Sequence, residues 1–151
     1  MDKEKVLASA RLLKSLPSGA VEEYAAKRQT IVAQMNRRIA AREDVLELIG
    51  GEENRNTMEN NHANHAKFME SMGSVFDPGT FVEIIVWVYR TYRARGFQPE
   101  YWNVQLNCWL EILRESLTEK SFDAFKPFYD FILQNHDFFV KTTAGEKAGA
   151  R

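Results

Sequence analysis

The stretch DPGTFVEIIVWVYRTYRARG, residues 77–96, decides the fold class of this chain. Asp77 and Pro78 are typical of a helix start, because an aspartate caps free backbone amides and proline has no amide hydrogen to leave unpaired in the first turn. The segment FVEIIVWVY is hydrophobic nearly all round, which predicts a central helix over 79–95 that its neighbours cover on most sides. Glu83, the one charge inside this segment, is expected on a strip that faces solvent.

Helical periodicity continues on both sides of this segment. Apolar residues recur at i, i+3 and i+4 spacing, whereas the sequence lacks alternating segments of useful length and Asn-Gly or Asp-Gly hairpin turns. The prediction is therefore an all-α fold, a bundle of about six to seven helices. The expected elements are a short helix before Pro17, a helix from its Ser18 cap to about Ala41, a helical turn ended by Gly50 and Gly51, and helices over about 57–72, 79–95 (ended by Gly96), 98–117 and 121–140.

The carboxyl-terminal part carries two further expectations. Pro127 lies inside the last predicted helix and removes one of its hydrogen bonds, so we expect a kink or a restart there. The final segment KTTAGEKAGAR has too few apolar side chains to pack. The chain is therefore predicted to divide into one helical domain over 1–140 and a disordered tail over 141–151.

Composition limits the function classes. The 151 residues suit one domain with one core, and 20 basic against 21 acidic residues give a net charge of -1, too little to attract nucleic acid or an anionic membrane. The longest apolar run, Ile84–Val88, is too short to cross a bilayer. Cys108 is the one cysteine, which excludes an intrachain disulfide and suits a reducing compartment. We expect a soluble, cytoplasmic protein with no nucleic-acid or membrane partner.

The polar residues offer little chemistry. His62 and His65 lie three residues apart on one stripe of the 57–72 helix, a spacing that can present two imidazoles to one metal ion. Two ligands are few and the HExxH pattern is absent, so we interpret both as hydrogen-bonded or half-exposed side chains and expect no metal. The sequence has no glycine-rich phosphate loop, no GxSxG elbow and no nucleophile beside a base. It predicts a non-enzymatic protein with no catalytic residue and no cofactor.

From about Arg37 onward, the order of these features resembles the non-haem, globin-like helical sensory domains at the front of bacterial stress-signalling and cobalamin-binding regulators. AAREDVLELIGG is similar to their short helix, PEYWNVQLNCWLEIL and FKPFYDFIL to their last two helices, and MENNHANHAKFM to their acidic-x-x-aromatic-His-Leu-x-aromatic-Leu element. His65 stands at the histidine of that element and Phe68 at its aromatic position. Those domains also carry Phe-x-x-Tyr-x-x-Trp and, eight residues later, Arg-Gly, where this chain has Phe81, Ile84, Trp87, Arg95 and Gly96.

Three residues beside His65 depart from that pattern. Asn61 stands where an acid is common, Asn64 where an aromatic residue is common, and Ala66 where leucine is common. The departures make this face unusually polar. A pocket inherited with the resemblance is therefore expected to differ in shape or content.

The resemblance implies a single globin-like bundle over 1–140 that senses a signal by binding a small apolar ligand or by docking to a protein partner, and that forms a homodimer. Globins that bind haem hold the iron through a histidine that would fall within 92–98 here, and that segment, YRARGFQ, has none. A haem site would need His62, His65 or Tyr92 as the iron ligand.

We interpret the chain as a sensory or regulatory domain whose pocket lies between the helix of His65 and the helix of Trp87. Two alternatives stay open at this point. One is a sensor that binds haem or another tetrapyrrole, and the other is a protein-protein interaction module whose aromatic side chains simply fill the core. The candidate pocket residues are His65, Phe68, Met69, Ile84, Trp87, Tyr92, Trp102 and Trp109.

Overall fold

Helices form every regular element in the part of the chain that the computed structural model describes, residues 2–73 and 76–144. This confirms the all-α prediction. Within these residues there are eight α-helices, rather than six to seven, and one short 3-10 helix, η1. The elements are α1 (Lys3–Ala10), α2 (Ser18–Ala40), α3 (Val45–Ile49), η1 (Glu52–Asn54), α4 (Arg55–Ser71), α5 (Pro78–Ala94), α6 (Glu100–Ser116), α7 (Glu119–Gln134) and α8 (His136–Thr142).

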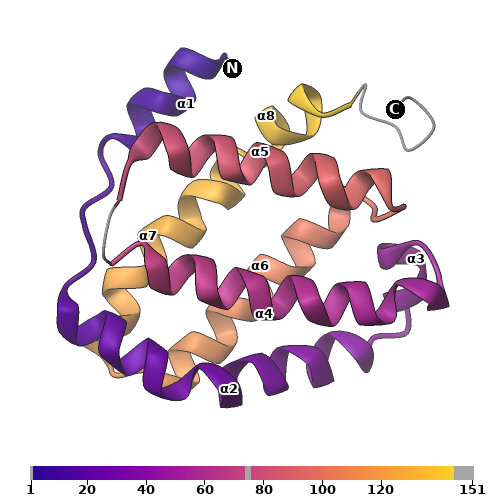
Figure 1. Ribbon diagram of the computed structural model, residues 1–151, viewed down its shortest axis with the longest axis horizontal. Coiled ribbons are helices and arrows are strands. Elements are labelled where there is room, and N and C mark those ends of the chain that lie inside the picture. Colours follow the sequence, from indigo (N-terminus) through magenta and orange to yellow (C-terminus); the bar gives the residue numbers. More distant parts are fainter. Residues whose placement is uncertain (1, 74–75, 145–151) are drawn as a thin grey trace.

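The long helices form two layers (Figure 1). The helices α2, α4 and α5 run across the front of the molecule, and α6 and α7 cross behind them at a steep angle. The backbone of α2 packs closely on α4, α6 and α7, whereas that of α5 packs closely on α1 and α8. Although α4 and α5 are neighbours in the front layer, each has its close backbone contacts with different helices. The space between α4 and α5 is therefore lined by side chains rather than closed by backbone packing.

Two helix starts test the predicted caps. Asp77 caps α5 as predicted, since its carboxylate accepts a hydrogen bond from the backbone amide of Thr80 at 2.8 Å. Ser18 is not a cap: it is the first residue of α2, and the Pro17 carbonyl before it already accepts the first amide hydrogen bonds of the helix. The first helix also ends earlier than predicted, at Ala10.

Two turns hold one end of the front layer together. Gly50 ends α3 with φ +87° and Gly96 follows α5 with φ +107°, which confirms the helix ends predicted at these glycines. A Cβ atom on Gly50 would lie 2.5 Å from the carbonyl oxygen of Gly96, so the turns approach closely. Between them, the side-chain amide of Asn54 donates to the carbonyls of Ile49 and Arg95, both at 2.8 Å. The start of α4 is thereby tied to the end of α5.

The helix α7 runs through Pro127 as one element, so the predicted restart does not occur. Phe125 and Phe128 on either side are 0% and 1% exposed. Burial of such side chains contributes about 1.5–3 kcal/mol each, which offsets the roughly 3 kcal/mol that an interior proline costs. The chain breaks instead at Asn135, whose side-chain amide donates to the Phe131 carbonyl at 2.8 Å. This break produces the eighth helix.

The helix predicted over 79–95 is present as α5, but one strip of it faces solvent. Trp87 is 57% exposed, and Thr80 and Glu83 on the same strip also face solvent, which confirms the expectation for Glu83. Isolated exposed apolar side chains are common on folded proteins. A helix that is hydrophobic all round therefore does not have to be covered all round. The buried residues of α5 are Phe81, Val82, Ile85, Tyr89 and Tyr92.

The packed chain extends past residue 140, where the predicted domain ends. The last helix, α8, ends at Thr142, and Thr143 is fully buried. Arg93 fixes this segment, because its guanidinium donates to the Val140 carbonyl at 2.9 Å and to the Thr143 hydroxyl at 3.0 Å. The rest of the predicted tail, 145–151, lies outside the described residues.

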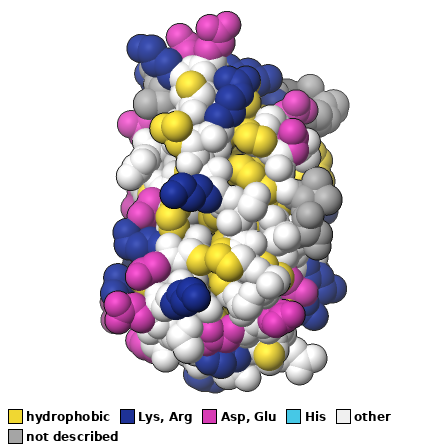
Figure 2. Space-filling model, turned by 90° about the vertical axis from the view of Figure 1, so that its left-hand side faces the viewer, with side chains coloured by type: hydrophobic (Ala, Val, Ile, Leu, Met, Phe, Trp, Pro, Cys, Tyr) yellow, Lys and Arg dark blue, Asp and Glu magenta, His cyan; other side chains and the backbone are white. Residues whose placement is uncertain are grey.

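Both signs of charge are spread over the surface. Figure 2 views the end of the molecule where α1 leads into α2, and shows Lys and Arg side chains interspersed with Asp and Glu. This pattern fits the net charge of -1. Among residues 2–73 and 76–144, none of the helices combines the length and the apolar character that a bilayer crossing requires.

Candidate ligand cavity

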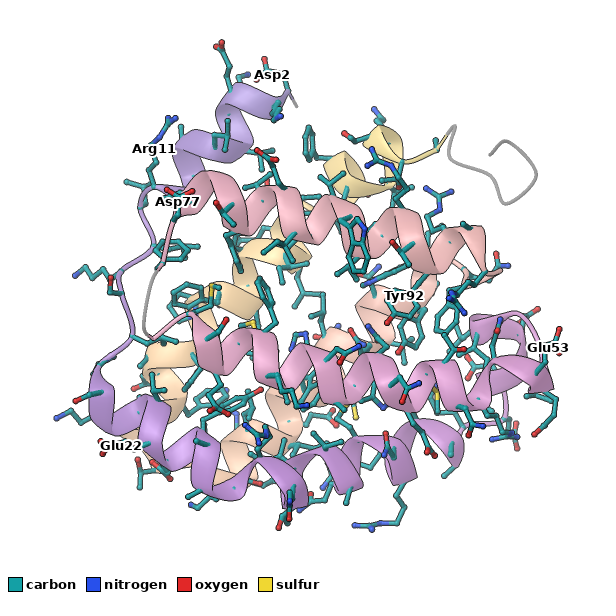
Figure 3. All side chains as sticks on the ribbon, viewed as in Figure 1. Asp2, Arg11, Glu22, Glu53, Asp77 and Tyr92 are labelled. Carbon is teal, nitrogen blue, oxygen red and sulfur yellow. The ribbon has the colours of Figure 1, made fainter. Side chains whose placement is uncertain are left out.

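A cavity of about 150 Å³ lies between α4 and α5. Side chains of α6 and α7, the rear layer in Figure 1, complete its walls. Figure 3 shows Tyr92, one of the lining residues, projecting from α5 towards α4. The lining residues are Asn61, Asn64, His65 and Phe68 of α4; Ile84, Ile85, Trp87, Val88, Tyr89 and Tyr92 of α5; Trp102, Gln105 and Leu106 of α6; and Ile132 of α7.

Six of the eight candidate pocket residues line this cavity. Met69 and Trp109 do not, because both are fully buried in the packed core. Trp109 lies behind the cavity wall, where its ring is stacked on the lining residue His65 with ring centroids 4.7 Å apart. The structure therefore has a cavity between the His65 and Trp87 helices, where the pocket was predicted. The six lining candidates are His65, Phe68, Ile84, Trp87, Tyr92 and Trp102.

Two buried amide side chains in the wall were not predicted. Asn61 and Gln105 line the cavity and are 5% and 2% exposed. A signal for Gln105 was present: it lies four residues after Tyr101 and four before Trp109, on the buried face of α6. Asn61 was noted only as a departure from the family pattern.

These two amides and a tyrosine form one hydrogen-bonded cluster. The Gln105 Nε2 group donates to Asn61 Oδ1 and, at 3.1 Å, to the Tyr101 hydroxyl. The Tyr101 hydroxyl lies 2.7 Å from Asn61 Oδ1 and donates to it. The cluster fixes the orientation of both amide planes, because each is held by two contacts.

His62 lies behind this cluster and is fully buried. Its Nδ1 lies 2.7 Å from Asn36 Oδ1, a carbonyl oxygen that only accepts, so Nδ1 carries the proton. In the neutral ring Nε2 is then an acceptor, 3.2 Å from the Tyr101 hydroxyl, which shares its proton between His62 and Asn61. Burial lowers the pKa of His62 to about 3, so the ring is neutral at pH 7.

His65 forms part of the cavity wall itself. Its Nε2 lies 3.0 Å from the Tyr129 hydroxyl, which in turn lies 3.1 Å from the Tyr24 hydroxyl. Burial, with a smaller contribution from His62, lowers the pKa of His65 to about 3. His65 is therefore also neutral at pH 7, and no Asp, Glu, Lys or Arg occurs among the described lining residues. The cavity is uncharged.

Aromatic rings make the wall on the α5 and α6 side. Tyr89 and Trp102 are stacked with centroids 4.2 Å apart and planes at 11°. The Tyr89 hydroxyl lies 2.7 Å from His136 Nδ1, and burial raises the pKa of this tyrosine, so it stays neutral. Trp87 is half exposed at the edge of the same wall. Flat apolar surfaces of this kind suit a small aromatic or aliphatic molecule.

The geometry argues against a metal or a tetrapyrrole. Both ring nitrogens of His62 and the Nε2 of His65 are engaged with other side chains. Nowhere in the described part of the chain do three or more His, Cys, Asp or Glu residues gather as a metal site would require. Pockets for drug-sized ligands span roughly 300–1,000 Å³, whereas this cavity is about 150 Å³. A porphyrin would not enter unless α4 and α5 moved apart.

Comparisons of the chain with protein-family models, with curated proteins and with solved structures give no match.

Proposed function

We propose that this chain is a non-enzymatic sensory or regulatory domain that binds a small, largely apolar molecule between α4 and α5. The observation that carries the proposal is the uncharged, aromatic-walled cavity at the junction of two helices whose backbones pack on different neighbours. A ligand there contacts both helices at once. It would therefore favour one separation of α4 and α5 over another, which is the differential affinity that a conformational signal requires.

Thermal unfolding with toluene tests the binding step. A ligand at tenfold its Kd adds about 1.4 kcal/mol to the free energy of unfolding, which corresponds to about 3–6 °C for a chain of this size. We expect the thermal midpoint to rise by this amount.

Two variants of α5 locate the site. Val88 lines the cavity and Val86 does not, although both are half-buried valines of the same helix. Val88→Phe fills the cavity and is expected to remove the toluene shift, whereas Val86→Phe is expected to keep it. A midpoint that toluene leaves unchanged, or a shift that survives Val88→Phe, contradicts the proposal.

The tetrapyrrole alternative has a direct optical test. The cavity volume of about 150 Å³ is too small for haem in this conformation. We therefore expect no protein-dependent visible absorption band on addition of haemin. A stable band that His65→Ala removes would restore the haem interpretation.

A second candidate function, a protein-interaction module, is favoured by one surface feature. Leu12 is 81% exposed in the α1–α2 linker, on the rim of a groove that Leu13, Pro17, Pro127 and Phe128 also line. Figure 2 shows hydrophobic side chains between the charges at this end of the molecule. The homodimer that the resemblance implies is the first partner to test. Sedimentation of wild type as a dimer, and of Leu12→Ser as a monomer, is expected from this candidate; a monomeric wild type contradicts it.

A further inference from the structure

The buried amides of Asn61 and Gln105 each use only one end in protein hydrogen bonds. Gln105 donates through Nε2, and Asn61 accepts through Oδ1. Neither Asn61 Nδ2 nor Gln105 Oε1 has a hydrogen-bond partner among the residues that the structure describes. Both side chains line the cavity and are at least nine-tenths buried. The two lining side chains thus leave one donor and one acceptor that the protein does not use.

This pairing does not depend on how the two amides are oriented. If both were rotated by 180°, Asn61 would donate to Gln105 and the Tyr101 hydroxyl would donate to Gln105 in place of Asn61. The free ends would then be Asn61 Oδ1 and Gln105 Nε2, again one acceptor and one donor. Neither free end is among the fully buried atoms without a partner, so a molecule or water in the cavity can reach both of them.

We infer that the natural ligand carries an uncharged head group with both a hydrogen-bond donor and an acceptor, as in a primary amide or a lactam, and that Asn61 and Gln105 bind this head group. The inference rests on the proposed function and specifies its ligand class. A neutral head group fits because the described lining residues include no charged side chain to pair with a carboxylate or an ammonium. A primary amide or a lactam carries both an N–H donor and a C=O acceptor, which complement one unused acceptor and one unused donor.

The remainder of the cavity sets the size of the ligand body. Its walls are the stacked Tyr89 and Trp102 rings and aliphatic side chains such as Ile84 and Leu106. An apolar cavity of about 150 Å³ takes a molecule the size of benzene, and the cavity between α4 and α5, head-group region included, has about this volume in total. The body is therefore one ring or a chain of similar size.

Calorimetric titration with benzamide, benzoate and toluene at pH 7 tests the head group, because the three probes share one ring. Two added hydrogen bonds are expected to make benzamide bind about tenfold or more tightly than toluene, with benzoate the weakest. In the Asn61→Leu and Gln105→Met variants, the affinity for benzamide is expected to fall to the affinity for toluene. Toluene binding itself is expected to persist. Asn64→Leu is the matched control: this asparagine also lines the cavity but is exposed, and its removal should preserve the benzamide preference.

A measurement on the wild-type protein keeps the inference testable if the variants do not fold. The side-chain NH₂ resonances of Asn61 are expected to shift with benzamide and to stay in place with toluene. Equal affinity for benzamide and toluene, or tighter binding of benzoate, would overturn the head-group inference and leave the cavity as an apolar site. Failure of all three probes to bind would overturn the proposed function as well.

Discussion

Acidification from pH 7.5 to pH 5 is expected to destabilise this protein through its buried histidines. His62 is fully buried, is held between Asn36 and Tyr101, and has a pKa that burial lowers to about 3. In the unfolded chain a histidine has a pKa near 6.5. Between pH 6.5 and pH 3, the unfolded chain therefore binds a proton that the folded protein does not. The contribution of His62 is fully present above pH 6.5 and is lost progressively below it.

The magnitude follows from this window. Each histidine that remains neutral in the fold lowers the free energy of unfolding by about 1.4 kcal/mol per pH unit below pH 6.5. From pH 6.5 to pH 5, His62 alone accounts for about 2 kcal/mol. His65, whose pKa is also lowered to about 3, adds to this loss. Typical domains have only about 5–15 kcal/mol of stability, so this loss of unfolding free energy should be readily measurable.

Carboxyl groups act at a lower pH and do not obscure the test. Hydrogen bonds lower the pKa of Glu23, Asp44, Asp77 and Glu115. Their contribution to stability is present above their unfolded pKa of about 4–4.5 and is lost only below it. The interval from pH 5 to pH 6.5 therefore isolates the histidines.

The assay is urea unfolding of wild type and His62→Gln at half-unit steps from pH 5 to pH 7.5. Glutamine retains a donor and an acceptor but does not titrate, so the variant should be less stable at pH 7.5 and should lose less stability on acidification. Below pH 6.5, the difference between the free energies of unfolding of wild type and His62→Gln should shrink by about 1.4 kcal/mol per pH unit. His136→Gln is the control, because His136 is only half-buried and its pKa is lowered less severely by burial. Parallel curves for wild type and His62→Gln, or an NMR titration of folded His62 near pH 6.5, would refute the reasoning.

Three further predictions concern stability in urea at pH 7.5. Gly50→Ala should destabilise by more than about 2 kcal/mol, because φ is +87° and the new Cβ would meet a backbone oxygen at 2.5 Å; Gly19→Ala, with nothing within 4 Å, should stabilise by about 0.4–1 kcal/mol. Asn54→Ala should cost about 1–3 kcal/mol, since two backbone carbonyls lose their donor. Trp109→Ala should cost about 3–5 kcal/mol, whereas Trp87→Ala, at a 57% exposed position, should change stability by about 0.5 kcal/mol or less. Equal effects of the two members of the glycine or the tryptophan pair would contradict these assignments.

Local signals in the sequence predicted the features that depend on local chemistry. The Asp77 cap and the glycine turns at Gly50 and Gly96 follow from the conformational preferences of single residues, and the structure has them. Pro127 shows the limit of this reasoning. Its local cost is real, but the burial of Phe125 and Phe128 is a tertiary effect that no local pattern contains.

Six of the predicted pocket residues lie around one cavity because helical periodicity places residues three or four apart on one face. His65 and Phe68 share a face of α4, as Ile84 and Trp87 share a side of α5, and these faces meet across the cavity. Asn61 was missed as a site residue because a polar side chain in an amphipathic helix is ordinarily interpreted as facing solvent. Only the packing of α6 against α4 shows that its amide is enclosed.

The persistence of the cavity itself argues for its use. Atoms that line unfilled space lose packing contacts, so the cavity of about 150 Å³ is destabilising compared with a filled core. A single larger side chain at Val88 would recover part of this free energy. Val88→Phe is therefore expected to raise the stability of the ligand-free protein while it prevents toluene from binding. Stabilisation without loss of binding would show that the added ring lies elsewhere, and destabilisation would show that the cavity walls are too rigid to accept it.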